Sequence, residues 1–210
     1  MLHRYVNSLL AGLAITLGGC AGAPQQVALM QAEHPDHTST SLETVSDVEG
    51  EFQTALQLMK SEDWHGAADK LAAITATEPT LPGPWTNLGI ARNKIGDTAG
   101  AENAFKRAIE INANQVVAYN ELGILYRRSG RLEEAAAIYN EGLKINPNAE
   151  EIHWNLGILY DRYLPNPSQA LVHYERYQQL TQSEDQQLLA WISELREQTD
   201  QVNVATGAKQ

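Results

Sequence analysis

The fold is decided by residues 116–149, VVAYNELGILYRRSGRLEEAAAIYNEGLKINPNA, because the chain repeats their landmarks at a fixed interval. The pair Leu122-Gly123 recurs as Leu-Gly 34 residues earlier and 34 residues later. Apolar residues in the stretch follow the three-and-four spacing of two amphipathic helices, which break at Gly130 and end before Pro147. A repeat of this length indicates an array of helical hairpins.

The unit resembles the tetratricopeptide repeat (TPR), a 34-residue helix–turn–helix with large and small residues at set positions. In the middle unit the matching residues are Tyr119, Leu122, Gly123, Tyr126, Gly130, Ala135, Tyr139 and Pro147. The preceding unit keeps Trp85, Leu88, Gly89, Ala101 and Phe105, and the following unit keeps Leu156, Gly157, Tyr160, Ala170 and Tyr174. A weaker unit comes first. The resemblance implies an all-α TPR helical-hairpin solenoid of about four repeats with a C-terminal capping helix.

The chain divides into five expected segments. They are a signal peptide (1–19), a lipidated cysteine with a flexible tether (20–46), the TPR array (47–182), a capping helix (183–199) and a disordered tail (200–210). Helices are predicted near 47–60, 64–77, 83–95, 98–111, 117–129, 132–145, 151–163 and 167–180. For the last helix, Ser183 and Gln186 have the spacing of a capping box.

The N-terminus has the pattern of a secreted lipoprotein. Arg4 precedes an apolar run that is too short to span a bilayer and is followed by small residues, which is typical of a signal peptide. The sequence that ends at Cys20, Leu-Gly-Gly-Cys, resembles the lipobox of bacterial lipoproteins, which implies acylation of that cysteine. Cys20 is the only cysteine, so no intrachain disulfide can form. Ala21 after it favours the outer membrane, facing the periplasm.

Composition and motifs exclude several function classes. The formal net charge of −11 disfavours binding to a phosphate backbone, so nucleic acid is not an expected partner. No phosphate loop, nucleophile elbow or zinc-protease motif is present, so we expect no enzyme activity and no cofactor. His34 and His37 lack further ligands at suitable spacing, and no metal site is predicted.

The resemblance implies that the first helix of each unit lines a concave groove. The residues carried onto this groove are Ile90, Lys94, Asn120, Ile124, Arg127, Arg128, Trp154, Ile158 and Arg162. The isoleucines form an apolar line that either faces a partner or packs between helices, and the basic residues either bind a partner or are solvated. Trp154 either replaces the core aromatic missing at His153 or anchors a ligand side chain, and we favour the groove.

These features predict a non-catalytic, membrane-anchored TPR lipoprotein. We expect its groove to bind a partner protein and the chain to act as a scaffold or assembly factor for an envelope complex of the pilus, secretion, motility or energy-transducing type. The combination distantly resembles the pilotins of type IV pili. The alternative is a regulator that docks onto a periplasmic cell-wall synthase or hydrolase.

Overall fold

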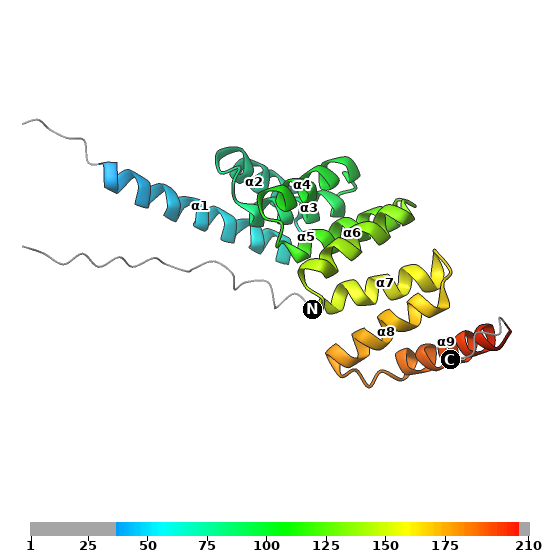
Figure 1. Ribbon diagram of the computed structural model, residues 1–210. Helices are drawn as coiled ribbons and strands as arrows, with labels where there is room; N and C mark the ends of the chain where they lie inside the picture. The colour runs from blue at the N-terminus through cyan, green and yellow to red at the C-terminus, as the bar shows by residue number, and fades with distance from the viewer. Residues whose placement is uncertain (1–36, 206–210) are drawn as a thin grey trace, which may run out of the picture. The chain divides into compact units, whose positions relative to one another are not determined.

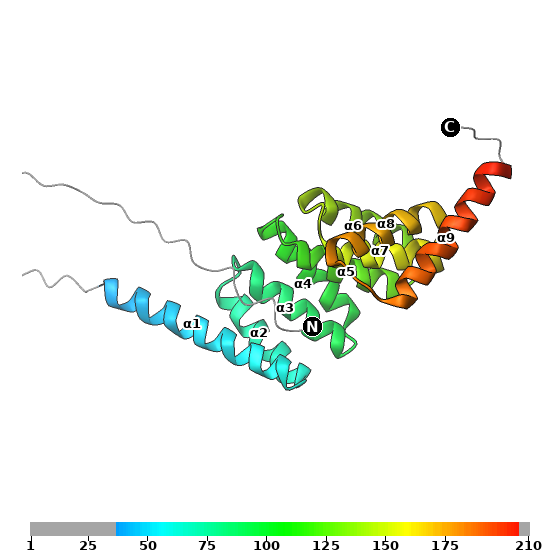
Figure 2. The ribbon, with the colours of Figure 1, turned by 90° about the horizontal axis from the view of Figure 1, so that it is seen from below.

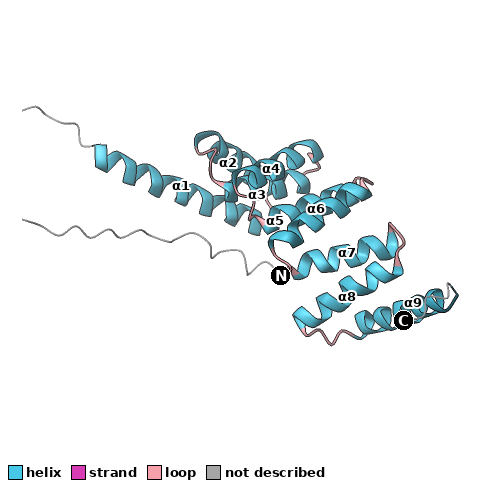
Figure 3. Cartoon of the chain, in the orientation of Figure 1, coloured by secondary structure: helices cyan, strands magenta, loops and turns pink. Residues whose placement is uncertain are grey.

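Nine α-helices and no strand account for residues 37–205, the part of the chain that the computed structural model describes (Figures 1 and 3). The helices are α1 (His37–Lys60), α2 (Trp64–Thr77), α3 (Pro82–Lys94), α4 (Thr98–Ile111), α5 (Val116–Arg128), α6 (Leu132–Ile145), α7 (Glu150–Arg162), α8 (Pro167–Thr181) and α9 (Gln186–Ala205). Helices α1 to α8 form four hairpins, and α9 follows the last one. The predicted hairpin array with a C-terminal helix is confirmed.

A glycine of the first helix lies directly against an aromatic ring of the second helix in three of these hairpins. A Cβ atom added at Gly123 in α5 would overlap the ring of Tyr139 in α6. The same contact occurs at Gly89 with Phe105 and at Gly157 with Tyr174. All three rings are fully buried. Only glycine allows this close approach, so the repeated Leu-Gly pair sets the packing inside each hairpin.

The turns inside the hairpins have recognisable local causes. Gly96 and Gly130 adopt φ angles of +86° and +75°, which glycine tolerates and other residues rarely do. After the first of these turns, Asp97 caps α4 because its Oδ1 accepts a hydrogen bond from the backbone N–H of Gly100 at 2.9 Å. The longer turn before α8 has no such glycine, and Asn166 caps that helix through Gln169 at 3.1 Å.

Successive hairpins stack in chain order, as Figure 2 shows from α2 to α9. The second helix of each hairpin contacts the first helix of the next, and α8 contacts α9 in the same way. The helices α3, α5 and α7 also contact one another along the stack, whereas no comparable contact joins α4, α6 and α8 in the described residues. We call α3, α5 and α7 the first-helix layer. It forms the inner side of the stack.

Three buried apolar clusters run through the array. The first joins α1 and α2 to α3 and α4, the second extends from α4 to α7, and the third joins α8 to α9. Ile90 packs against both the first and second clusters, and Tyr160 packs against both the second and third. Each hairpin therefore buries its apolar face on its neighbours, as expected for a repeat protein.

The ends of the array differ from the prediction. Helix α1 begins at His37, inside the segment expected to be a tether; residues 20–36 of that segment, the signal peptide and Cys20 lie outside the described residues. Helix α9 continues through Ala205, past the predicted end, and residues 206–210 are not described. No described helix is long and apolar enough to cross a bilayer.

The predicted capping box before α9 is wrong. The cap is Asp185, whose Oδ1 accepts hydrogen bonds from the backbone N–H groups of Gln187 at 2.8 Å and Leu188 at 3.2 Å. Ser183 instead accepts from the N–H of Asp185 at 3.3 Å. Two residue types that both favour helix starts stand two positions apart here, and the one adjacent to the helix caps it.

Candidate protein-interaction surface

The residues predicted to form a groove lie on the three neighbouring helices of the first-helix layer. Helix α3 carries Ile90 and Lys94, α5 carries Asn120, Ile124, Arg127 and Arg128, and α7 carries Trp154, Ile158 and Arg162. In each helix an isoleucine is followed four residues later by a cation. Residues four apart lie on the same face of a helix, so the pattern places an apolar line beside a basic line.

The three isoleucines are half-buried. Ile90 packs against the first and second apolar clusters, Ile124 against the second and Ile158 against the third. Each side chain therefore packs between helices and also retains exposed apolar surface. The packing alternative is thus partly realised, and contact of the exposed part with a partner stays a prediction.

Three of the cations lie over aromatic rings of neighbouring elements. The Nζ atom of Lys94 is 5.3 Å from the ring centroid of Trp64. The guanidinium carbon of Arg127 is 5.4 Å from the ring of Tyr163, and that of Arg162 is 5.5 Å from the ring of Trp191. Cation–π contacts of this kind contribute about 0.5–1 kcal/mol at exposed sites. They restrain the three side chains, and of these only Arg162 also forms an ion pair among the described residues, with Asp161 at 3.6 Å.

Trp154 lies in an aromatic cluster at the C-terminal end of the array. Its half-buried indole is 5.0 Å from the ring of Tyr177, 5.6 Å from Tyr174 and 6.2 Å from Trp191, measured between centroids. Helix α9 supplies the last of these rings. The indole therefore packs between the last hairpin and α9 and keeps part of its surface exposed, and its contact with a partner stays a prediction.

Two further polar groups on α5 lie in the first-helix layer. The Oδ1 atom of Asn120 accepts a hydrogen bond from Asn155 Nδ2 in α7 at 2.9 Å, which ties the two helices together. Glu121 is half-buried, and this burial raises its pKa, although the charge of Lys94 on α3 opposes the shift. The sequence reasoning missed Glu121 because it considered only the positions that line the groove in the resembled family.

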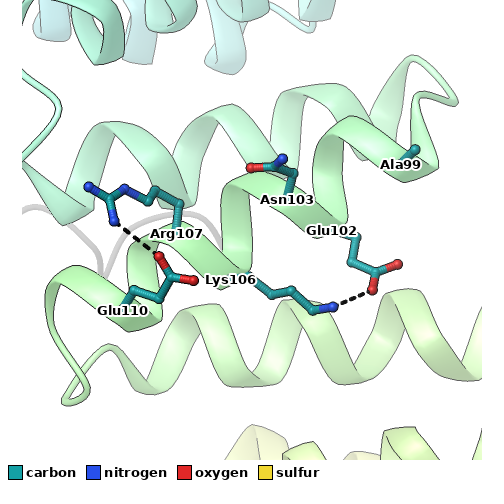
Figure 4. Close-up of a pocket in the computed structure, with 6 residues that line it drawn as sticks. All are labelled: Ala99, Glu102, Asn103, Lys106, Arg107 and Glu110. Atoms are coloured by element: carbon teal, nitrogen blue, oxygen red, sulfur yellow. Dashed lines mark hydrogen bonds and ion pairs between the residues drawn. The ribbon is translucent and has the colours of Figure 1, made fainter.

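The outer side of the array carries a shallow depression on α4 (Figure 4). It is lined by Ala99, Glu102, Asn103, Lys106, Arg107 and Glu110. Its charges already neutralise one another, because Lys106 Nζ lies 2.7 Å from Glu102 Oε1 and Arg107 lies 3.0 Å from Glu110 Oε2. We assign this depression a structural role.

Glu102 also joins two hairpins. Its Oε2 accepts a hydrogen bond from Arg131 at 2.6 Å, and its Oε1 accepts one from the hydroxyl of Tyr126 at 3.0 Å. The hydrogen bond from Arg131 is the largest cause that lowers the pKa of Glu102 to about 2. The guanidinium carbon of Arg131 in turn lies 4.0 Å from the ring centroid of Tyr126. This network, which we call the clasp, holds α4 against the next hairpin through hydrogen bonds and an ion pair. The sequence reasoning missed it.

His153 and His173 form a buried pair in the last hairpin. Their Nδ1 atoms are 3.0 Å apart, and His153 Nε2 lies 3.0 Å from the carbonyl oxygen of Pro147. Tyr160 stacks on His173 with a centroid distance of 5.9 Å. No cluster of three or more metal-ligating side chains occurs in the described part of the chain, and this pair is accordingly described as a packing element.

Three family models match consecutive parts of the array. A model described as "TPR repeat" matches residues 125–162, and two described as tetratricopeptide repeats match residues 104–137 and 83–115. Together they cover helices α3 to α7, where the glycine-on-aromatic contacts recur. The chain contains tetratricopeptide repeats. The hairpin α1/α2 and the helices α8 and α9 extend this TPR array beyond the matched residues.

Solved structures share the TPR fold. The crystal structure of MamA matches with a TM-score of 0.60 and 21% identity over 69% of this chain and 84% of that chain. The first TPR of Spaghetti (RPAP3), bound to the HSP90 peptide SRMEEVD, matches with a TM-score of 0.52 and 23% identity over 54% and 90%. A mutant O-GlcNAc transferase of Thermobaculum terrenum matches with a TM-score of 0.59 and 15% identity over 64% and 26%. At these identities the similarity shows the fold.

No curated protein is significantly similar to the chain. TPR units are in general non-catalytic modules for protein–protein interaction, and some, as in the transferase above, accompany a catalytic domain. The interaction surface on the first-helix layer is therefore the candidate site of this protein.

Proposed function

We propose that the chain is a lipid-anchored TPR lipoprotein of the bacterial envelope that scaffolds or assembles a complex by binding a partner protein on its first-helix layer. One observation carries the binding part: each helix of this layer presents a half-exposed isoleucine and a cation on one face. A second supports it, since a similar TPR structure is bound to a peptide.

The proposed anchor depends on the N-terminal sequence. An apolar run followed by Leu-Gly-Gly-Cys matches the lipobox, and Cys20 would carry the acyl chains. Each buried methylene contributes about 0.8 kcal/mol, so several acyl chains hold a protein on a membrane without a spanning helix. Residues between Cys20 and the array then set how far the TPR surface reaches from the bilayer.

Cross-linking by position tests where the partner binds. A photoreactive amino acid is placed on the first-helix layer at Val117 or Asn93, and on the second helices at Ala137 or Gln179 as matched controls. In cells of the source organism, we expect a partner-sized adduct from the first pair of positions only. Adducts of equal yield from the second helices would contradict the assignment of the surface.

The identity of the cross-linked protein separates the two functions. A component of a pilus, secretion, motility or energy-transducing complex supports the scaffold function. A peptidoglycan synthase or hydrolase supports the alternative, in which the array regulates a cell-wall enzyme.

Lipidation has its own test. Labelled palmitate should enter the wild-type chain and not Cys20→Ser, and the substituted chain should leave the membrane fraction. Incorporation that persists in Cys20→Ser would refute the anchor and would leave the binding surface unaffected.

A further inference from the structure

The cations of the array are distributed unevenly between paired and unpaired positions. On the second helices and their turns, most basic side chains lie beside a carboxylate. These ion pairs are Lys70–Glu51, Lys106–Glu102, Arg107–Glu110, Arg131–Glu102 and Arg131–Glu134, and α9 adds Arg196–Glu175. Lys144 on α6 and Arg176 on α8 form no ion pair in the described part of the chain. An acidic chain of net charge −11 offers enough carboxylates to pair its cations.

The C-terminal ends of the first helices carry most of the unpaired cations of the described residues, although Arg92 in the last turn of α3 pairs with Asp97 at 3.7 Å. Among the described residues, Lys60, Lys94, Arg127 and Arg128 form no ion pair with a carboxylate, and they end α1, α3 and α5. Arg162 at the end of α7 has only its sequence neighbour Asp161, at 3.6 Å. We call these five residues the cation edge.

Contacts along the array place these ends on one side. Lys94 lies over Trp64, which begins α2 directly after the end of α1, and Arg127 lies over Tyr163, directly after the end of α7. Cations at helix ends are favoured by the helix dipole, which explains their residue type. The dipole does not explain why four of the five form no ion pair among the described residues, or why aromatic rings hold three of them.

We propose, on the basis of the proposed function, that the occupant of this surface is an acidic segment of a partner protein. Its Asp or Glu side chains pair with the cation edge, and apolar side chains between them contact Ile90, Ile124 and Ile158. Charge complementarity carries this assignment, because four cations gather at the ends of neighbouring first helices without an ion-pair partner in the described residues of an acidic chain. Burial against the isoleucines would strengthen each charge pair by excluding water.

The geometry also sets the spacing of the segment. Packed helices lie about 8–10 Å apart, and an extended chain advances about 3.3 Å per residue. A segment that crosses the first helices in an extended conformation therefore meets a new cation about every three residues. The expected pattern is an acidic residue at every third position with an apolar residue between.

Peptide binding to the full chain tests this inference. The probes are fluorescein-labelled (Glu-Val-Thr)₄ and its neutral match (Gln-Val-Thr)₄, followed by fluorescence anisotropy. We expect the glutamate peptide to bind at least tenfold more tightly at low salt and to lose this advantage as ionic strength rises. Equal binding of the two peptides would overturn the proposal.

A matched pair of charge reversals locates the site. Arg128→Glu removes an exposed cation from the end of α5, and Lys144→Glu makes the same charge change in the last turn of α6, a second helix. Neither residue forms an ion pair in the described structure, so neither change should unfold the chain. We expect Arg128→Glu to weaken binding of the glutamate peptide at least fivefold and Lys144→Glu to weaken it less than twofold. Equal effects of the two changes would contradict the proposed location of the site.

Vesicles distinguish an acidic lipid surface from an acidic peptide. The chain could bind phosphatidylglycerol vesicles and lose this binding in Arg128→Glu, while it does not bind the glutamate peptide. That result would overturn the acidic segment and assign the surface to a membrane contact. Cross-linking from Val117 that persists in Arg128→Glu would retain the proposed function and refute the acidic occupant.

Discussion

The Nδ1 atoms of His153 and His173 lie 3.0 Å apart in the interior of the last hairpin, and the surroundings assign their protons. The carbonyl oxygen of Pro147 can only accept, so His153 must carry its proton on Nε2. Its bare Nδ1 then accepts from the Nδ1–H of His173. The neutral pair is satisfied in this arrangement, whereas a second proton between the two Nδ1 atoms would break it.

Acidification should therefore destabilise the last hairpin. Burial lowers the pKa of His173 to about 4, with a smaller contribution from His153, and burial also lowers the pKa of His153. Because the unfolded chain binds these protons near pH 6.5, stability is complete above that pH and falls as the pH drops toward 4. At 1.36 kcal/mol per pKa unit, the loss is on the order of 2–3 kcal/mol. Urea unfolding from pH 7 to pH 4 measures it.

His173→Asn supplies the test of this mechanism, because an amide N–H replaces the Nδ1–H donor and does not titrate. The pH dependence between 6.5 and 4 should flatten in this variant. His65→Gln changes an exposed histidine of α2 and should leave the profile as in the wild type. A wild-type profile in His173→Asn would contradict the role of the pair.

Gly123→Ala should destabilise the array by about 1–3 kcal/mol, because the new methyl group overlaps the buried ring of Tyr139. Gly50→Ala is the matched control, since nothing lies within 4 Å of a Cβ at that position in α1. Alanine is the better helix former, so this change should stabilise the chain by about 0.5–1 kcal/mol. Thermal unfolding followed by circular dichroism measures both.

Glu102→Gln should loosen the clasp between the second and third hairpins. The change removes the charge that Arg131 and Lys106 share, and we expect Tm to fall by about 2–4 °C. Glu134→Gln removes the other, exposed carboxylate bound to Arg131 and should have a smaller effect. Because the pKa of Glu102 is lowered to about 2, the contribution of the clasp is present above pH 4.5 and disappears as the pH falls through 2.

Trp191→Ala should destabilise the C-terminal end by about 2 kcal/mol, since it removes a half-buried ring that contacts Trp154 and Tyr174. Leu189→Ala on the same helix changes a side chain that is 37% exposed and should cost less. Hydrogen exchange should show the loss of protection in α8 and α9 first. Equal destabilisation by both substitutions would contradict the assignment of Trp191 to this interface.

The bounds of a helix were predictable from the sequence wherever a glycine or proline marks the adjacent turn. The second helices 98–111 and 132–145 have the predicted bounds because Gly96, Gly130 and Pro147 mark the turns around them. The first helices α3, α5 and α7 each begin and end one residue earlier than predicted, a difference within the usual uncertainty of helix ends. The start of α1 at His37 was missed because the polar residues that open this helix show no sustained apolar period.

Side-chain surroundings were less predictable because they depend on how hairpins stack. Glu102 and Arg131 are 29 residues apart, and no local spacing indicates that they meet. Trp154 follows His153, which occupies the position of the usual large aromatic, so the sequence left two orientations open. In the structure the rings of Tyr177 and Trp191 pack against the indole of Trp154, which stays partly exposed. The isoleucine and cation pattern was visible in advance because it repeats with the unit.

Two half-buried side chains connect the three apolar clusters into one continuous core. Ile90 bridges the first and second clusters and Tyr160 bridges the second and third, and the buried rings of Phe105 and Tyr174 pack on Gly89 and Gly157 at the same two junctions. Ile90 also belongs to the face assigned to the partner. A polypeptide bound there would therefore also contact the packing that joins the first two clusters, so a change at Ile90 affects partner binding and the stability of the stack together.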